Sequence, residues 1–125
     1  MTPRWNHLHA LAETQIKTTL AALPKPLRVR ARSLPVLCEP RPNAALLADG
    51  IEKDTLGLFV GEAFPDSESG ALQLPAQIIL YLENIWELAE EDEDCYREEI
   101  RTTLLHELGH YLGLDEIDLE ERGLD

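Results

Sequence analysis

The residues with the clearest chemical potential are His106-Glu107-Leu108-Gly109-His110, near the C-terminal end of the chain. On an α-helix, residues four apart lie on one face, about 40° apart around the axis. The imidazoles of His106 and His110 can therefore converge on one cation, and their nitrogen donors suit zinc. Glu107 lies about 100° around the helix from His106, so it is placed beside the ion rather than on it.

This arrangement predicts hydrolytic chemistry. Zinc lowers the pKa of a bound water towards about 7, and a neighbouring carboxylate such as that of Glu107 can accept the proton. A shuffled chain of this composition contains H-E-x-x-H about once in sixty trials, so chance is a weak explanation. The alternative is a pair of exposed histidines beside an ordinary surface glutamate.

A zinc site of this kind needs a third protein ligand. Gly113 can adopt the left-handed conformation that ends a helix and turns the chain back towards the histidines. Asp115 and Glu116 follow it, and both offer carboxylate oxygens. Because Asp115 also suits the capping of a following turn, we favour Glu116 as the third ligand and keep Asp115 as the alternative.

The other histidines and the cysteines are expected to be bystanders. His7 and His9 fall on the predicted N-terminal helix and are interpreted as surface residues. Cys38 and Cys95 are far apart in the sequence and have no metal-like spacing, so two free thiols are predicted.

The first half of the chain is predicted to hold one helix and one strand. Apolar residues recur at helical spacing from Trp5 to Leu23, after a capping Thr2 and before Pro24. Residues 27–37 begin by alternating apolar and basic, which predicts a half-buried strand. Its arginines are interpreted as a solvated or salt-bridged face, with anion binding as the alternative. Residues 39–54 are expected to be irregular.

The second half is predicted to hold two strands and two helices. Strands are expected at 56–64 and 77–82, the latter covered on both faces because it is almost continuously apolar. A helix over 83–88 and an acidic turn at 90–94 lead to a long final helix over about 94–112. Its apolar arc lies nearly opposite the histidines, so these should face solvent or a cleft.

This order of elements predicts an α+β fold, with residues 1–125 as a single domain. A small mixed sheet is expected to pack against the N-terminal helix and the C-terminal helix that carries the histidines. The formal charge of −13 disfavours nucleic-acid partners. No apolar run approaches the roughly 20 residues of a membrane span, and no secretory signal is evident, so a cytoplasmic location away from membranes is expected.

The stretch from Leu104 to Glu116, LLHELGHYLGLDE, resembles the zincin metallopeptidases and their metzincin-like form, H-E-x-x-H-x-x-G-x-x-[H/D/E]. The short chain with its C-terminal motif is most similar to the minimal-zincin family of small bacterial proteins. The resemblance implies that His106, His110 and Glu116 bind zinc and that Glu107 is the general base. It also implies a peptide or protein substrate.

The chain departs from the metzincins in two respects. They usually have His or Asp where this chain has Glu116, and they place a methionine turn beneath the metal, whereas the only methionine here is Met1. Only nine residues follow Glu116, so we expect no C-terminal subdomain, and a protein partner that completes the cleft is one expectation.

In zincins, an edge strand aligns extended peptide through backbone hydrogen bonds. By resemblance, either the strand around Phe59 or that from Ile78 to Leu82 would do so. Tyr81 or an arginine is a candidate oxyanion stabiliser, and that role stays unassigned.

The leading functional hypothesis is zinc-dependent hydrolysis of peptide bonds. One alternative is a zinc-stabilised interaction module without catalysis. Another is a metal-dependent endoribonuclease, because H-x-x-x-H-x-x-G-x-D also resembles the bacterial ribosomal-RNA maturation endonucleases. Those enzymes use three histidines, whereas this chain has Glu116 in the third position.

Overall fold

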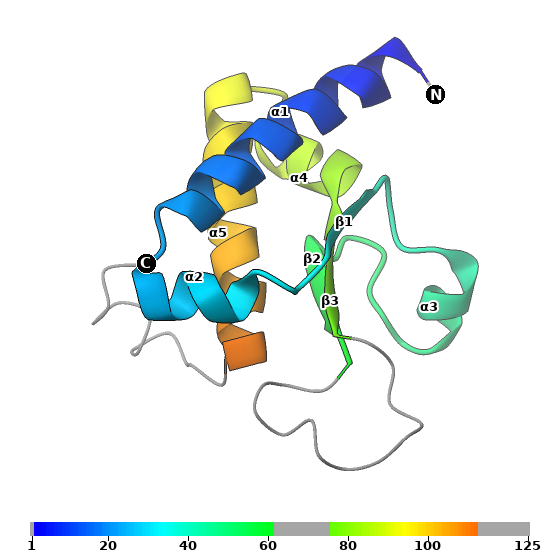
Figure 1. The fold of residues 1–125 in the computed structure, drawn as a ribbon. Helices are drawn as coiled ribbons and strands as arrows, with labels where there is room; N and C mark the ends of the chain where they lie inside the picture. The colour runs from blue at the N-terminus through cyan, green and yellow to red at the C-terminus, as the bar shows by residue number, and fades with distance from the viewer. Residues whose placement is uncertain (1, 62–75, 113–125) are drawn as a thin grey trace.

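A small mixed sheet of three strands, in the order β1-β3-β2, lies at the centre of the fold (Figure 1). The computed structural model describes residues 2–61 and 76–112. Strand β1 (Val36–Glu39) runs parallel to the central β3 (Gln77–Tyr81), and β2 (Gly57–Val60) runs antiparallel to it. Within the described ranges, β1 and β2 are therefore the two edges of the sheet.

Two long helices cover one face of this sheet. These are α1 (Pro3–Ala21) and α5 (Glu93–Leu112), which lie on the same side of the strands in Figure 1. The shorter helices are α2 (Lys25–Ala31), α3 (Ala44–Ala48) and α4 (Leu82–Leu88). The predicted α+β class and its arrangement of sheet and helices are confirmed. None of the described helices combines the length and apolar character that a bilayer crossing requires.

The central strand is buried on both faces, as predicted. Successive side chains of a strand point to opposite faces. Ile78 and Leu80 belong to the main hydrophobic core with the helices, whereas Ile79 and Tyr81 are buried on the other face. This alternation places the side chains of Leu80 and Tyr81 on opposite sides of the sheet.

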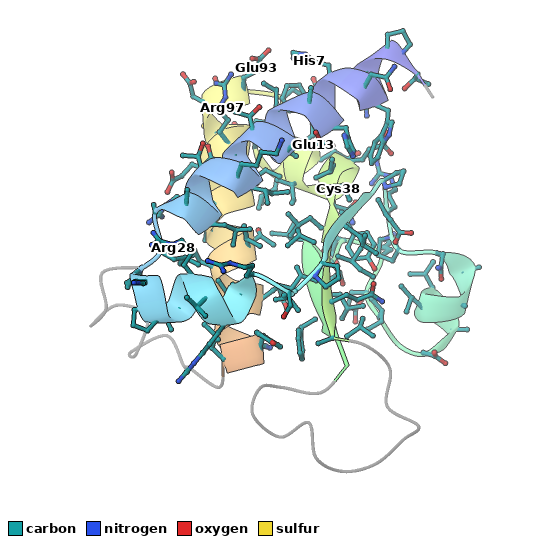
Figure 2. The ribbon with its side chains drawn as sticks, viewed as in Figure 1. His7, Glu13, Arg28, Cys38, Glu93 and Arg97 are labelled. Atoms are coloured by element: carbon teal, nitrogen blue, oxygen red, sulfur yellow. The ribbon has the colours of Figure 1, made fainter. Side chains whose placement is uncertain are left out.

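Helix α1 forms as the sequence predicts and is tied to α5. The hydroxyl of Thr2 accepts a hydrogen bond from the Trp5 amide at 3.1 Å and caps the helix. The buried Tyr96 hydroxyl donates to the Leu8 carbonyl at 2.9 Å, which joins the two long helices in the core. At the surface, His7 contacts Glu93 at 3.0 Å (Figure 2), in agreement with its predicted exposed position.

The predicted strand over 27–37 is wrong in its first part, because residues 25–31 form helix α2. The buried residues Leu27, Ala31 and Leu34 are spaced by four and three, which is a helical stripe, whereas Val29 is 50% exposed. Pro26 lies in the first helical turn, where its fixed φ is favourable. The strand starts only at Val36.

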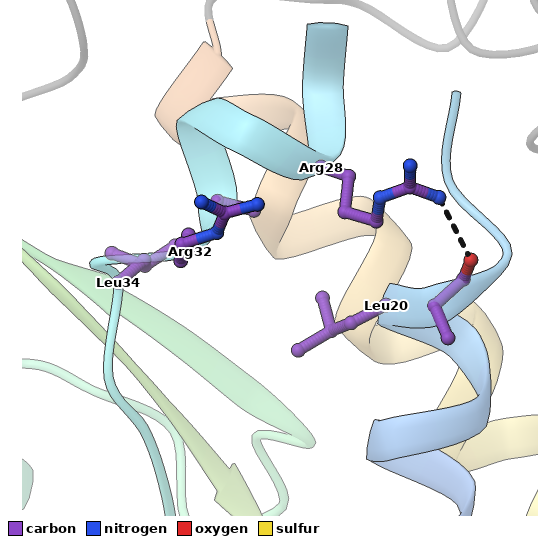
Figure 3. Close-up of a pocket in the computed structure, with 6 residues that line it drawn as sticks. Leu20, Arg28, Arg32 and Leu34 are labelled. Atoms are coloured by element: carbon purple, nitrogen blue, oxygen red, sulfur yellow. Dashed lines mark hydrogen bonds between the residues drawn. The ribbon is translucent and has the colours of Figure 1, made fainter. Parts of the chain in front are cut away.

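The arginines of this segment therefore lie on a helix and not on a strand face. Arg28 donates a hydrogen bond at 3.4 Å to the carbonyl of Ala21, the last residue of α1. Figure 3 shows this contact beside the small pocket between α1 and α2, which Leu20, Arg32 and Leu34 also line. A cation at a helix C-terminus offsets the negative end of the helix dipole, which gives Arg28 a structural role.

Residues 39–54 are not entirely irregular as expected, since they contain the short helix α3. The Asn43 side chain accepts a hydrogen bond from the Leu46 amide at 2.9 Å and caps this helix. No residue of α3 is buried. The helix therefore depends on its cap and lacks the apolar stripe that would have revealed it in the sequence.

A buried asparagine on α4 fixes the segment that leads into β2. The amide nitrogen of Asn84 donates to the carbonyls of Lys53 and Thr55, both at 2.9 Å. Its oxygen accepts from Arg41 at 2.7 Å. Because both ends of the amide are bonded, Asn84 holds the start of β2 in one position relative to α4.

The acidic turn and the helices around it are confirmed. Glu90 and Glu91 adopt positive φ angles of 56° and 61°, which reverse the chain after α4. Asp92 then accepts a hydrogen bond from the Cys95 amide at 2.9 Å at the start of α5. The predicted helices over 83–88 and 94–112 match α4 and α5 closely.

Both cysteines are free thiols, as predicted. Burial, together with the nearby Glu13 carboxylate, raises the pKa of the Cys38 thiol to about 11 (Figure 2 shows both residues). A hydrogen bond with Asp92 raises the pKa of the Cys95 thiol above its ordinary value. Both thiols are protonated at neutral pH and are poor nucleophiles, so cysteine chemistry is not favoured at either position.

Strand β2 lies close to α5 at Gly57. A Cβ atom placed on Gly57 would lie 2.7 Å from Cγ2 of Thr103 and 3.3 Å from Cγ of Glu107. Glycine is therefore needed here for close contact between strand and helix.

We predict that Gly57→Ala destabilises the protein by about 1–3 kcal/mol, because the added methyl overpacks this contact. Thr103→Ser removes the Cγ2 methyl, so the Gly57→Ala penalty should shrink in that background. Urea unfolding of the four proteins in this double-mutant cycle measures the coupling. An equal penalty in both backgrounds would contradict the contact.

Candidate metal centre

Helix α5 has an apolar face in the core and a polar stripe towards β2. Its fully buried side chains include Tyr96, Ile100, Leu104 and Leu108. The polar stripe consists of residues spaced three and four apart, namely Glu99, Thr102, Thr103, His106, Glu107 and His110. The core contacts of one face thus fix the direction in which the other face points.

His106 and His110 lie side by side on the last two turns of α5, and both are exposed, as the helical arc predicts. Their ring centroids are 4.8 Å apart, with an angle of 53° between the ring planes. Two imidazoles bound to one tetrahedral zinc, with Zn–N distances of about 2.0–2.1 Å, have ring centres about 5 Å apart. The separation of the two rings therefore fits a shared zinc ion.

Glu107 is only 8% exposed, although it carries a carboxyl group. Its side chain packs between α5 and the start of β2, next to Gly57 and Thr103. Within residues 2–61 and 76–112, the carboxylate has no hydrogen-bond or ion-pair partner. The Tyr81 hydroxyl is the only fully buried side-chain polar atom without a partner among the described residues, so the Glu107 carboxylate keeps access to the pocket that it lines.

A pocket of about 270 Å³ opens beside these residues, between β2 and α5. Leu56 and Gly57 line it on the strand side. The helix side is the polar stripe from Glu99 to Glu107, including His106. The pocket therefore brings the imidazole of His106 and the carboxylate of Glu107 to one cavity large enough for part of a substrate.

The third predicted ligand, Glu116, and its alternative Asp115 lie outside the described residues. Within the described ranges, no cluster of three His, Cys, Asp or Glu side chains is close enough to hold a metal ion. The described part of the chain thus contains two of the three predicted zinc ligands, His106 and His110.

Of the two strands considered for substrate alignment, β2 is the one at an edge. β3 pairs with β1 on one side and with β2 on the other, so its backbone groups are used within the sheet. β2 pairs with β3 only, as far as the described strands show, and its start lines the pocket. The strand around Phe59 therefore satisfies the requirement for an edge next to the motif helix.

Tyr81 does not lie at this centre. It is fully buried on the sheet face opposite to α5, and burial raises the pKa of its hydroxyl. Among the described residues its hydroxyl has no hydrogen-bond partner. Tyr81 is therefore unsuitable as an oxyanion stabiliser for chemistry at His106, and none of the described arginines lines the pocket.

Sequence reasoning missed three residues of the site: Gly57, Thr103 and Glu99. Thr103 and Glu99 could have been found by stepping back from Glu107 in intervals of four, since these positions share one face of a helix. Gly57 carries no such signal, because its role depends on which strand packs against α5.

The comparison with protein families agrees with this geometry. The family model described as zincin-like metallopeptidase matches residues 31–124, which include α5 and all three strands. No curated protein matches the chain. The family match confirms the resemblance seen in the motif. The chain belongs to the zincin-like metallopeptidase family.

Proposed function

We propose that this protein hydrolyses peptide bonds, with zinc held by His106, His110 and Glu116 and with Glu107 as the general base. The family implies a metallopeptidase with a metal, typically zinc. The observation that carries the proposal is the pair of exposed imidazoles, 4.8 Å apart, of which His106 lines a pocket together with Glu107. When bound, zinc supplies a Lewis acid that polarises a carbonyl and acidifies water.

Glu107 is suited to move the proton in this reaction. Its packing against Gly57 restricts the side chain to the pocket wall. A carboxylate held there takes a proton from the attacking water and delivers it to the leaving amine. Because Glu107 is largely buried and lines the pocket, its carboxylate acts on groups that enter the pocket.

Strand β2 provides a surface for the substrate backbone. An extended peptide that pairs with the edge of β2 that no described strand occupies gains main-chain hydrogen bonds without any demand on sequence. The pocket beside Gly57 then receives a side chain of that peptide. Asn84 supports this role, since its two hydrogen bonds hold the segment immediately before β2.

The acidic lining of the pocket supports peptide over RNA as the substrate. Glu99 and Glu107 both line the cavity, and the whole chain carries a formal charge of −13. Phosphates are repelled by such a field unless cations offset it. Cleavage of structured RNA by the zinc-loaded protein would contradict this choice.

We predict that Glu107→Gln lowers kcat for peptide cleavage by about 10²–10⁴-fold, because the amide cannot accept the proton. Zinc content should stay unchanged, since the imidazoles are untouched. Glu98→Gln is the matched control, because Glu98 is exposed on the same helix and pairs with Arg101. A Glu107→Gln protein with full activity would disprove the mechanism, and zinc binding without any cleavage would favour the interaction module.

Metal binding is tested separately. Changes to the outer-shell partners of a metal site weaken metal binding by roughly 10–100-fold. We predict a larger loss of zinc affinity for His106→Ala, His110→Ala and Glu116→Ala. Asp115→Ala should not cause such a loss. Zinc affinity is measured by calorimetry on the purified variants. Since both histidines are exposed, the metal-free variants should melt at the wild-type temperature. Unchanged zinc affinity in the His106→Ala protein would refute the site.

A further inference from the structure

We propose that the pocket between β2 and α5 is a subsite for a lysine or arginine side chain of the substrate, with Glu99 as its counter-charge. This inference rests on the proposed function and names the class of peptide that the site prefers. It concerns a residue two turns away from the metal-binding histidines.

Glu99 is distinct from the other acidic residues in the described part of α5 before the motif. Glu93 and Asp94 pair with Arg97, and Glu98 pairs with Arg101. Within residues 2–61 and 76–112, Glu99 has no ion-pair partner, although it is half-buried and lines the pocket. Its carboxylate is therefore available for a cation that comes from outside the described chain.

The spacing along α5 matches the length of a basic side chain. Glu99 precedes His106 by two turns, about 10 Å along the helix axis. An extended lysine reaches about 6 Å from its Cα, and its ammonium forms an ion pair at about 3 Å from an oxygen. A peptide whose backbone lies near His106 can thus place a lysine or arginine head at Glu99.

The middle of the pocket suits the aliphatic stem of such a side chain. Leu56 lines the strand side of the pocket, and Thr102 and Thr103 line the helix side between Glu99 and His106. Lysine and arginine commonly bury their methylene groups against apolar surface while the charged head reaches a polar partner. An acidic side chain in the same place would meet Glu99 with like charge.

The test uses three peptides that differ in one residue, which is lysine, norleucine or glutamate, and that end in a hydroxamate to bind zinc. A second set carries the hydroxamate at the opposite end of the peptide, so that the variable residue lies on the other side of the zinc-binding group. Calorimetry on the zinc-loaded protein gives the affinities. In one set we expect the lysine peptide to bind about fivefold more tightly than the norleucine peptide, as for a partly exposed ion pair.

The variants assign this preference to Glu99. Glu99→Gln should remove the difference between lysine and norleucine, and Glu99→Lys should make the glutamate peptide the tightest. Glu98→Gln should keep the wild-type preference. Equal affinities for lysine and norleucine in both sets, or a preference that survives Glu99→Gln, would overturn the subsite.

Cleavage measured on matching peptides without the hydroxamate separates this inference from the proposed function. A lysine preference in binding without any cleavage would refute peptide hydrolysis and support the subsite. Cleavage without a lysine preference would support hydrolysis and refute the subsite. Failure of all the hydroxamate peptides to bind would overturn both.

Discussion

The packing of α5 is the constraint on which the rest of the structure depends. One face of this helix is fixed in the core, where the Tyr96 hydroxyl bonds to the Leu8 carbonyl and its ring packs edge-on against Trp86. The opposite stripe then has no rotational freedom. The Cα–Cβ bonds of His106 and His110 therefore point in fixed directions at the surface. This preorganisation lowers the conformational entropy lost when two side chains bind one ion.

The same packing positions Glu107. This residue is only 8% exposed, and it lines the pocket beside His106. The close contact with Gly57 on β2 keeps the side chain there. Asn84 in turn holds the segment before β2 through two backbone carbonyls. The site is thus supported by α4 and β2 as well as by its own helix.

The sequence allowed the motif helix, α1, β2 and β3 to be predicted because each has a clear period or a continuous apolar run. The two-histidine spacing is also local, since it needs only one helical turn. The prediction of a strand from Leu27 failed because, over a short window, an alternating pattern and a helical stripe place apolar residues at the same positions, such as Leu27 and Ala31. Helix α3 was not predicted because none of its residues is buried, so its sequence has no apolar stripe at helical spacing.

Features that depend on distant parts of the chain could not be predicted. Nothing in the sequence showed that β3 is central and β2 lies at an edge, because strand order is decided by tertiary pairing. The pocket lining by Glu99 and the contact between Gly57 and Thr103 have the same origin. Tyr81 was a reasonable candidate in sequence, and only the strand alternation places it on the wrong face.

The contact between Gly57 and Thr103 also constrains how this protein can evolve. Two residues far apart in the chain share one small space, so a side chain at position 57 is tolerated only if Thr103 is replaced by a smaller residue. In descendants of this sequence, a residue larger than glycine should appear at position 57 only where position 103 carries a side chain smaller than threonine, although neither residue is among the predicted metal ligands.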